Sequence, residues 1–106
     1  MINELFDMRM NDGSRHFADM PETVFFDEVA DHAEKLSGAE ITRFITDGVI
    51  EMWLDLKWRD NEFSINNQFG DYWFFVTDPD CPDEILLEFC SHFRKLLESP
   101  ENETKE

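Results

Sequence analysis

The sequence predicts an α+β fold, in which a helix, a four-stranded antiparallel meander and a second helix form a two-layer sandwich. Two stretches, 21–37 and one beginning at Pro82, repeat apolar residues every three or four positions, the spacing of one helical face. Four stretches between them are rich in aromatic and β-branched residues, which strands favour. Turn signals at 47–48, 60–61 and 70–71 separate these four stretches. Helices with one apolar face must cover a sheet, which gives the layered architecture.

The chain of 106 residues fits a single domain. We predict an N-terminal arm or edge strand at 1–20, where Phe6, Met8 and Met10 alternate with polar residues. The α+β domain is expected to span 21–98. Residues 99–106 are expected to form a disordered acidic tail, since they offer nothing to bury.

The first helix is predicted at 21–37. Pro21 suits the first helical position, where its missing N–H would be unpaired anyway, and Glu22 complements the positive end of the helix dipole. Gly38 can take the left-handed conformation that ends a helix. The apolar face comprises Phe25, Val29, Ala33 and Leu36.

The four strands are predicted at 40–46, 49–58, 62–69 and 72–77. The second shows the clearest alternation, which separates a core face from an outer face. Two-residue turns at 47–48, 60–61 and 70–71 then fix which side chains share a face. The second helix follows, with Pro82 at its start, acids behind it, and Pro100 beyond its end.

An aromatic row is predicted on the outer face of the sheet, the side away from the helices. Large exposed apolar patches mark interaction sites, so these residues are the candidate partner-binding surface. The candidate residues are Phe44, Trp53, Trp73 and Phe75, among the polar Glu51, Asp55, Asn66 and Gln68.

Three arrangements compete for this face. In the first, a partner protein or a second copy of the chain docks on it. In the second, the N-terminal arm, with Leu5, Phe6, Met8 and Met10, folds over it. In the third, the register is shifted by one residue or the first helix covers the face. Only the first arrangement is functional.

A net charge of −16 narrows the choice of partner. Nucleic acid and anionic membranes are disfavoured because both are negatively charged, whereas a basic protein is favoured. The sequence shows no signal peptide and no apolar run long enough to span a bilayer, so a cytoplasmic location is expected.

Catalytic and metal-binding motifs are not recognised in the sequence. Cys81 and Cys90 lack histidines at zinc-ligand spacing, and on one helix they lie too far apart for a disulfide. The acids around Asp78 do not fit a calcium loop and are explained by helix capping. We therefore predict no metal, no cofactor and no enzymatic activity.

The leading hypothesis is a small non-enzymatic interaction protein of inhibitor, immunity or chaperone-like type. It would bind a basic partner through the outer sheet face, with Trp53 and Trp73 as anchors. The first alternative is an acidic mimic of nucleic acid. The second is a small-molecule binder or an enzyme that uses a pocket between the sheet and the helices.

Overall fold

The fold combines six strands with two helices in a computed structural model that describes residues 5–47, 51–68 and 70–98. The prediction of an α+β class is confirmed. In chain order the elements are β1 (Met8–Arg9), β2 (Arg15–Met20), α1 (Phe26–Glu34), β3 (Glu40–Thr46), β4 (Met52–Trp58), β5 (Asn61–Asn66), β6 (Tyr72–Val76) and α2 (Asp83–Leu97).

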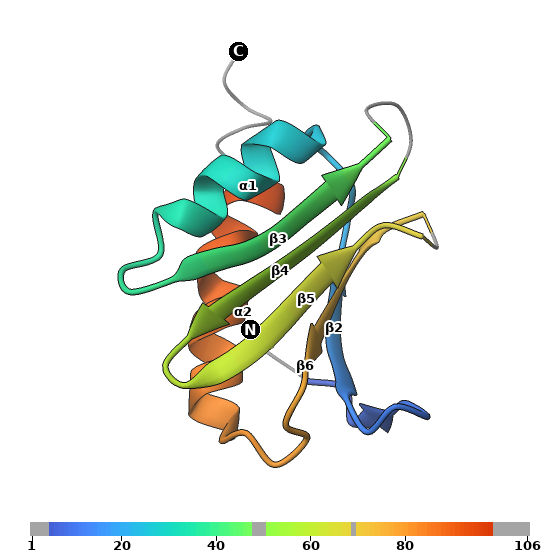
Figure 1. Ribbon diagram of the computed structural model, residues 1–106, viewed down its shortest axis with the longest axis vertical. Coiled ribbons are helices and arrows are strands. Elements are labelled where there is room, and N and C mark those ends of the chain that lie inside the picture. Colours follow the sequence, from blue (N-terminus) through green and yellow to red (C-terminus); the bar gives the residue numbers. More distant parts are fainter. Residues whose placement is uncertain (1–4, 48–50, 69, 99–106) are drawn as a thin grey trace.

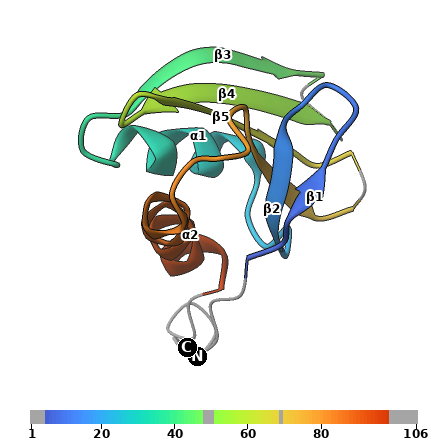
Figure 2. The same ribbon diagram turned by 90° about the horizontal axis from the view of Figure 1, so that it is seen from below.

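The strands form one antiparallel sheet with the order β1-β2-β6-β5-β4-β3 (Figure 1). The sheet is strongly curved, and both helices lie on its concave side (Figure 2). The face away from the helices is called the outer face below. It is convex, and the strands that come from the N-terminal part of the chain form one end of it.

The number of strands corrects the prediction, because the sheet has six strands where four were expected. Strand β2 lies within the segment predicted as an arm or edge strand, yet it pairs with β6 on one side and β1 on the other. A register shift between His16 and Ala18 explains why alternation did not reveal it. Phe17 and Ala18 are both buried in the core, so the bulge breaks the period of two that marks a strand.

Both helices begin later than predicted. Helix α1 starts at Phe26 rather than near Pro21, because tertiary bonds hold the preceding segment. The Thr23 hydroxyl donates to the Leu97 carbonyl at 2.9 Å, and the Tyr72 hydroxyl donates to the Val24 carbonyl at 2.8 Å.

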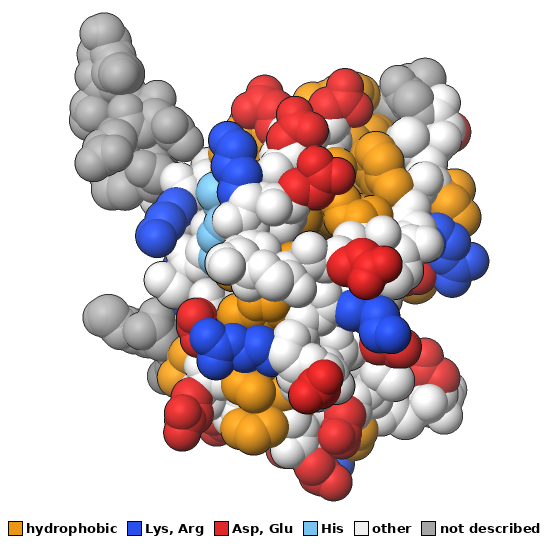
Figure 3. All heavy atoms as spheres, turned by 60° about the vertical axis from the view of Figure 1, so that its left-hand side comes forward, with side chains coloured by type: hydrophobic (Ala, Val, Ile, Leu, Met, Phe, Trp, Pro, Cys, Tyr) orange, Lys and Arg blue, Asp and Glu red, His pale blue; other side chains and the backbone are white. Residues whose placement is uncertain are grey.

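On the side of the molecule that α1 covers, charged side chains are spread over the surface (Figure 3).

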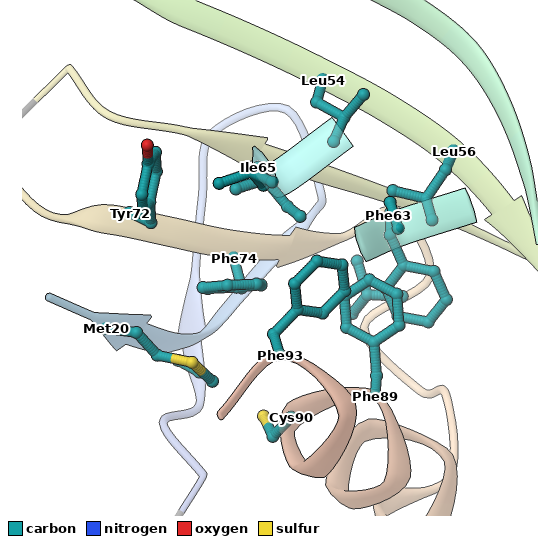
Figure 4. Close-up of a cluster of buried hydrophobic side chains, with 14 of the residues drawn as sticks. Met20, Leu54, Leu56, Phe63, Ile65, Tyr72, Phe74, Phe89, Cys90 and Phe93 are labelled. Carbon is teal, nitrogen blue, oxygen red and sulfur yellow. The ribbon is translucent and has the colours of Figure 1, made fainter. Parts of the chain in front are cut away.

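The core lies between the helices and the concave face of the sheet. Phe89 of α2 stacks on Phe63 with ring centroids 4.1 Å apart, and Phe17 meets both rings edge-on at 6.0–6.1 Å. Phe93 packs beside Phe74 at 5.4 Å. Figure 4 shows these rings from α2 pointing into the sheet side chains. Such aromatic pairs add stabilisation beyond the apolar area that they bury.

The registers of β4–β5 and β5–β6 show how far the predicted turn positions were correct. The β4–β5 turn is formed by Arg59 and Asp60, both with positive φ (52° and 64°), one residue earlier than predicted. Trp53 consequently faces Asn66 rather than Gln68. The β5–β6 pairing differs from the prediction in the same way, with Asn66 opposite Trp73. Both pairings shift by two positions, which leaves every side chain on its predicted face.

Replacing Phe89 by alanine is expected to lower the free energy of unfolding by about 3–5 kcal/mol, the usual loss for a buried phenylalanine. Phe89 is fully buried and contacts rings of β2, β5 and β6. The control is Phe25→Ala, which truncates a ring that is 48% exposed. Urea unfolding followed by far-UV circular dichroism measures both. Equal losses in the two variants would contradict this account of the core.

Candidate functional site

The outer face carries side chains from five neighbouring strands. The registers place His16 of β2 beside Phe75, and Trp73 beside Asn66. They also place Ser64 beside both Phe75 and Asp55. The residues of this face that matter below are His16, Arg43, Ile45, Trp53, Asp55, Ser64, Asn66, Trp73 and Phe75.

His16 covers the predicted anchor Trp73. The imidazole stacks on the indole with ring centroids 4.2 Å apart, and Phe75 lies 5.1 Å from the imidazole. Phe6 of the N-terminal segment packs edge-on against His16 at 5.3 Å. The N-terminal arm, one of the three arrangements considered for this face, therefore covers it at one end, and Trp73 is half-buried as a result.

Asp55 fixes the orientation of the other predicted anchor, Trp53. One carboxylate oxygen accepts the indole N–H of Trp53 at 2.7 Å and the hydroxyl of Ser64 at 2.6 Å. The second oxygen accepts the Arg43 Nε–H at 3.1 Å. These three bonds come from β3, β4 and β5, so the carboxylate holds the Trp53 ring against rotation.

A hollow of about 180 Å³ opens on the outer face beside Trp53. We call it the aromatic hollow. One wall comes from β4, β5 and β6, and the other comes from the β1–β2 hairpin. Its lining residues are Met10, Asp12, Ser14, Trp53, Ser64, Phe75 and Thr77.

Asp12 supplies negative charge at the rim of the aromatic hollow. The amide and hydroxyl of Ser14 both donate to Asp12 Oδ1, at 2.9 and 2.7 Å. These bonds lower the pKa of the Asp12 carboxyl, so the group is ionised at neutral pH. The hollow thus combines two aromatic side chains, Trp53 and Phe75, with a carboxylate.

A second, shallower hollow of about 310 Å³ lies where β3 meets β4. It brings together three of the predicted site residues, Glu51, Trp53 and Gln68, with Ile45. Asn66 is buried rather than available to a partner. Its side-chain oxygen accepts a hydrogen bond from the backbone N–H of Gln68 at 3.3 Å. The structure therefore does not bring the predicted site residues together in one hollow.

Phe44 is the predicted site residue that the structure places on the wrong side. It lies opposite Leu54 on the concave face, whereas the prediction placed it near Glu51 on the outer face. The two-residue turn at 47–48 would set Thr46 opposite residue 49; in the structure Thr46 lies opposite Met52, three residues later. An odd shift reverses the faces of a strand, so Ile45 takes the outer position beside Trp53. Gly48 itself lies outside the described residues.

Several residues of this face were missed by sequence reasoning. His16 and the hairpin residues Asp12 and Ser14 reach it because β2 is part of the sheet. The only sequence signal was the turn at 11–13 between short alternating segments. Arg43 and Ile45 were missed because the predicted β3–β4 register was wrong by an odd number of residues, which exchanged the two faces of β3.

A stacked histidine pair joins the two helices on the other side of the molecule. His32 of α1 and His92 of α2 have ring centroids 4.0 Å apart. Each Nε2–H donates to the backbone carbonyl of the other residue at 2.6 Å. Figure 3 shows pale blue histidine side chains with blue basic side chains nearby.

Both His16 and His92 are held in the neutral form. Burial lowers the pKa of His16, against the opposing effects of its bond to the Ala18 carbonyl and the charge of Asp19. Burial also lowers the pKa of His92. Its bond to the His32 carbonyl opposes this shift, and electrostatic interactions with His32, Lys95 and Lys35 add to it.

Potential metal ligands in the described part of the chain are dispersed, and the Cys90 thiol is buried. Within residues 5–47, 51–68 and 70–98, no group of three or more His, Cys, Asp or Glu side chains is placed to hold a metal ion. Burial raises the pKa of the Cys90 thiol to about 11, so that thiol is protonated at neutral pH and unreactive. No helix among these residues is long and apolar enough to cross a membrane.

Comparisons of the chain with protein-family models, curated proteins and solved structures found no match.

The free energy of unfolding is expected to fall as pH decreases from 7.5 to 5. The pKa values of His16 and His92 are lowered by folding, so below the unfolded value of 6.5 the unfolded chain binds more protons than the folded one. The stability present at neutral pH is therefore lost on acidification. Urea unfolding at a series of pH values measures this loss.

The variant His92→Gln is expected to reduce the pH dependence, since glutamine retains a donor for the His32 carbonyl but does not titrate. Glu34→Gln is the control, because it removes an exposed charge of α1 and no histidine. An unchanged pH dependence in both variants would show that His92 is not its source.

Proposed function

We propose that this chain is a small, acidic, non-enzymatic interaction domain of inhibitor, immunity or chaperone-like type, which binds a basic partner protein in the cytoplasm. The outer face is the binding surface, and the aromatic hollow receives one lysine or arginine side chain of the partner. The observation that carries the proposal is the combination of Trp53, Phe75 and the Asp12 carboxylate around one hollow.

The aromatic walls suit a cation. An ammonium or guanidinium group is attracted to the face of an indole or phenyl ring by about 0.5–2 kcal/mol, depending on how far it is desolvated. Asp55 holds Trp53 in place before binding, through the 2.7 Å bond to its indole N–H. A fixed ring loses little conformational entropy when the partner docks.

The acidic rim of the hollow both attracts a cationic side chain and orients it. Asp12 is ionised and lies at the edge of the hollow, where it can accept a hydrogen bond from a cationic side chain. The net charge of −16 adds a long-range field that accelerates the approach of a basic protein. The same negative field repels nucleic acid and so disfavours its binding.

The size of the hollow favours a side chain over a free small molecule. Its volume of about 180 Å³ is below the ~300–1,000 Å³ that is typical of small-molecule pockets. For the aromatic hollow, this volume supports an interaction domain over a small-molecule binder.

Titration with N-acetyl-arginine amide is expected to shift the indole N–H resonance of Trp53 in a saturable way, measured by ¹H–¹⁵N NMR. Trp53→Ala and Asp12→Asn should each weaken the response of the remaining hollow residues several-fold, because each removes one side of the cation site. N-acetyl-glutamine amide, which has no charge, should give no saturable shift.

Asp60→Asn is the matched control for Asp12→Asn. It removes the same charge from the β4–β5 turn, seven residues from Trp53 and therefore about 23 Å along the strand. Equal weakening by the two charge variants would favour the acidic nucleic-acid mimic, in which total charge decides binding. Unfolding of Trp53→Ala in the absence of ligand would assign that ring to the core and contradict the proposal.

A further inference from the structure

Strand β3 is an open edge of the sheet. It pairs with β4 on one side, and no other strand in the described part of the chain pairs with its second side. Six of its seven residues are exposed. An open edge presents unpaired backbone N–H and C=O groups, which are a template for an added strand. The opposite edge, β1, has only two residues and offers no such length.

The regular part of this edge that carries the inference is residues 43–45. A register shift between Ile41 and Arg43 interrupts the pairing with β4 before this segment, and pairing is continuous after it. Two large apolar side chains lie here on opposite faces of the sheet: Phe44 is 37% exposed on the concave face, and Ile45 is 53% exposed on the outer face. An added strand would therefore be contacted on both of its faces.

Acidic side chains of α1 stand beside the concave side of this edge. Asp27, Glu28, Asp31 and Glu34 are all exposed, and α1 packs against β3. Figure 3 shows a group of acidic side chains next to exposed hydrophobic ones on this side of the molecule. Residues of an added strand that point to this side would meet an apolar ring first and carboxylates beyond it.

We propose that β3 is a second docking surface, on which an extended segment of a basic partner adds a strand to the sheet. The segment alternates apolar β-branched residues, which contact Ile45, with lysine or arginine. The apolar stem of each basic residue covers Phe44, and its charged end reaches the carboxylates of α1. Backbone hydrogen bonds provide affinity and the alternation provides specificity.

A second copy of the chain is a poorer occupant of the same edge. Pairing β3 with β3 of another copy brings two molecules of net charge −16 together and places the acidic α1 helices near the same junction. Like-charge contacts of this kind oppose association. The edge therefore favours a strand of opposite charge. This inference concerns backbone pairing at the sheet edge and does not depend on the aromatic hollow.

The test is a titration of the ¹⁵N-labelled chain with an acetylated octapeptide in which valine and lysine alternate. The expected result is a set of saturable shifts in the amides of 40–46. Two further peptides carry methyl groups on alternate backbone nitrogens, one on the odd-numbered and the other on the even-numbered residues. Only one of these patterns blocks the N–H groups that would pair with β3, so one of the two peptides should bind at least tenfold more weakly. An octapeptide that alternates valine and glutamate should also bind at least tenfold more weakly.

Ile45→Lys should weaken the valine–lysine peptide at least tenfold, because it places a charge on the edge and removes the apolar contact. Met8→Lys is the matched control: Met8 is also 53% exposed, but it lies on the β1 edge. The shifts of the 40–46 amides and of the Trp53 indole N–H are fitted separately, because a lysine of the peptide can also enter the aromatic hollow. Loss of the 40–46 shifts alone is a failure of this inference, and loss of the Trp53 shift alone is a failure of the aromatic hollow.

Two results would overturn the inference. Shifts confined to Trp53 and its neighbours, or no saturable shift at all, would show that the edge does not accept a strand. Shifts of 40–46 on dilution without peptide, together with a concentration-dependent molecular mass in sedimentation, would show that a second copy takes this edge instead.

Discussion

The packing of Phe89 on the sheet is the contact on which the rest of the fold depends. This one ring meets Phe17, Phe63 and Phe74, which come from β2, β5 and β6. It therefore ties the N-terminal strand, which reaches the sheet from far away in sequence, to strands of the central meander. Burial of a shared aromatic cluster makes these elements fold cooperatively, since none of them can cover its apolar side alone.

The position of the helices determines what the outer face can do. Because both helices occupy the concave side, only the β1–β2 hairpin and the N-terminal segment of the described chain reach the convex side (Figure 2). His16 closes one end over Trp73, and the aromatic hollow stays open beside Trp53. The face is thus partly internal structure and partly candidate binding surface. A fully exposed aromatic row would have been an aggregation risk, which the hairpin reduces.

The candidate site was predicted in part, and the reasons for success and failure lie in strand parity. Trp53, Asp55, Asn66, Trp73 and Phe75 fall on the predicted face because the register errors in β4–β5–β6 were even. Phe44 does not, because the error at β3 was odd. Asn66 shares the face but is buried between strands, which alternation alone does not reveal. The net charge and the place of Trp53 and Phe75 on the outer face were predictable from the sequence.

By itself, the sequence determined the α+β class, the presence of two helices and the acidic character, because periodicity and composition are local or additive properties. Tertiary structure alone decided that β2 joins the sheet and that His16 stacks on Trp73. It also decided that Asp12 and Trp53 line one hollow, and that no second strand pairs with β3 within the residues that the structure describes. These features depend on which distant segments share the core and on where bulges break the period of two. A short stretch of residues reveals neither the association of distant segments nor the position of a bulge, because both depend on the packing of the surrounding structure.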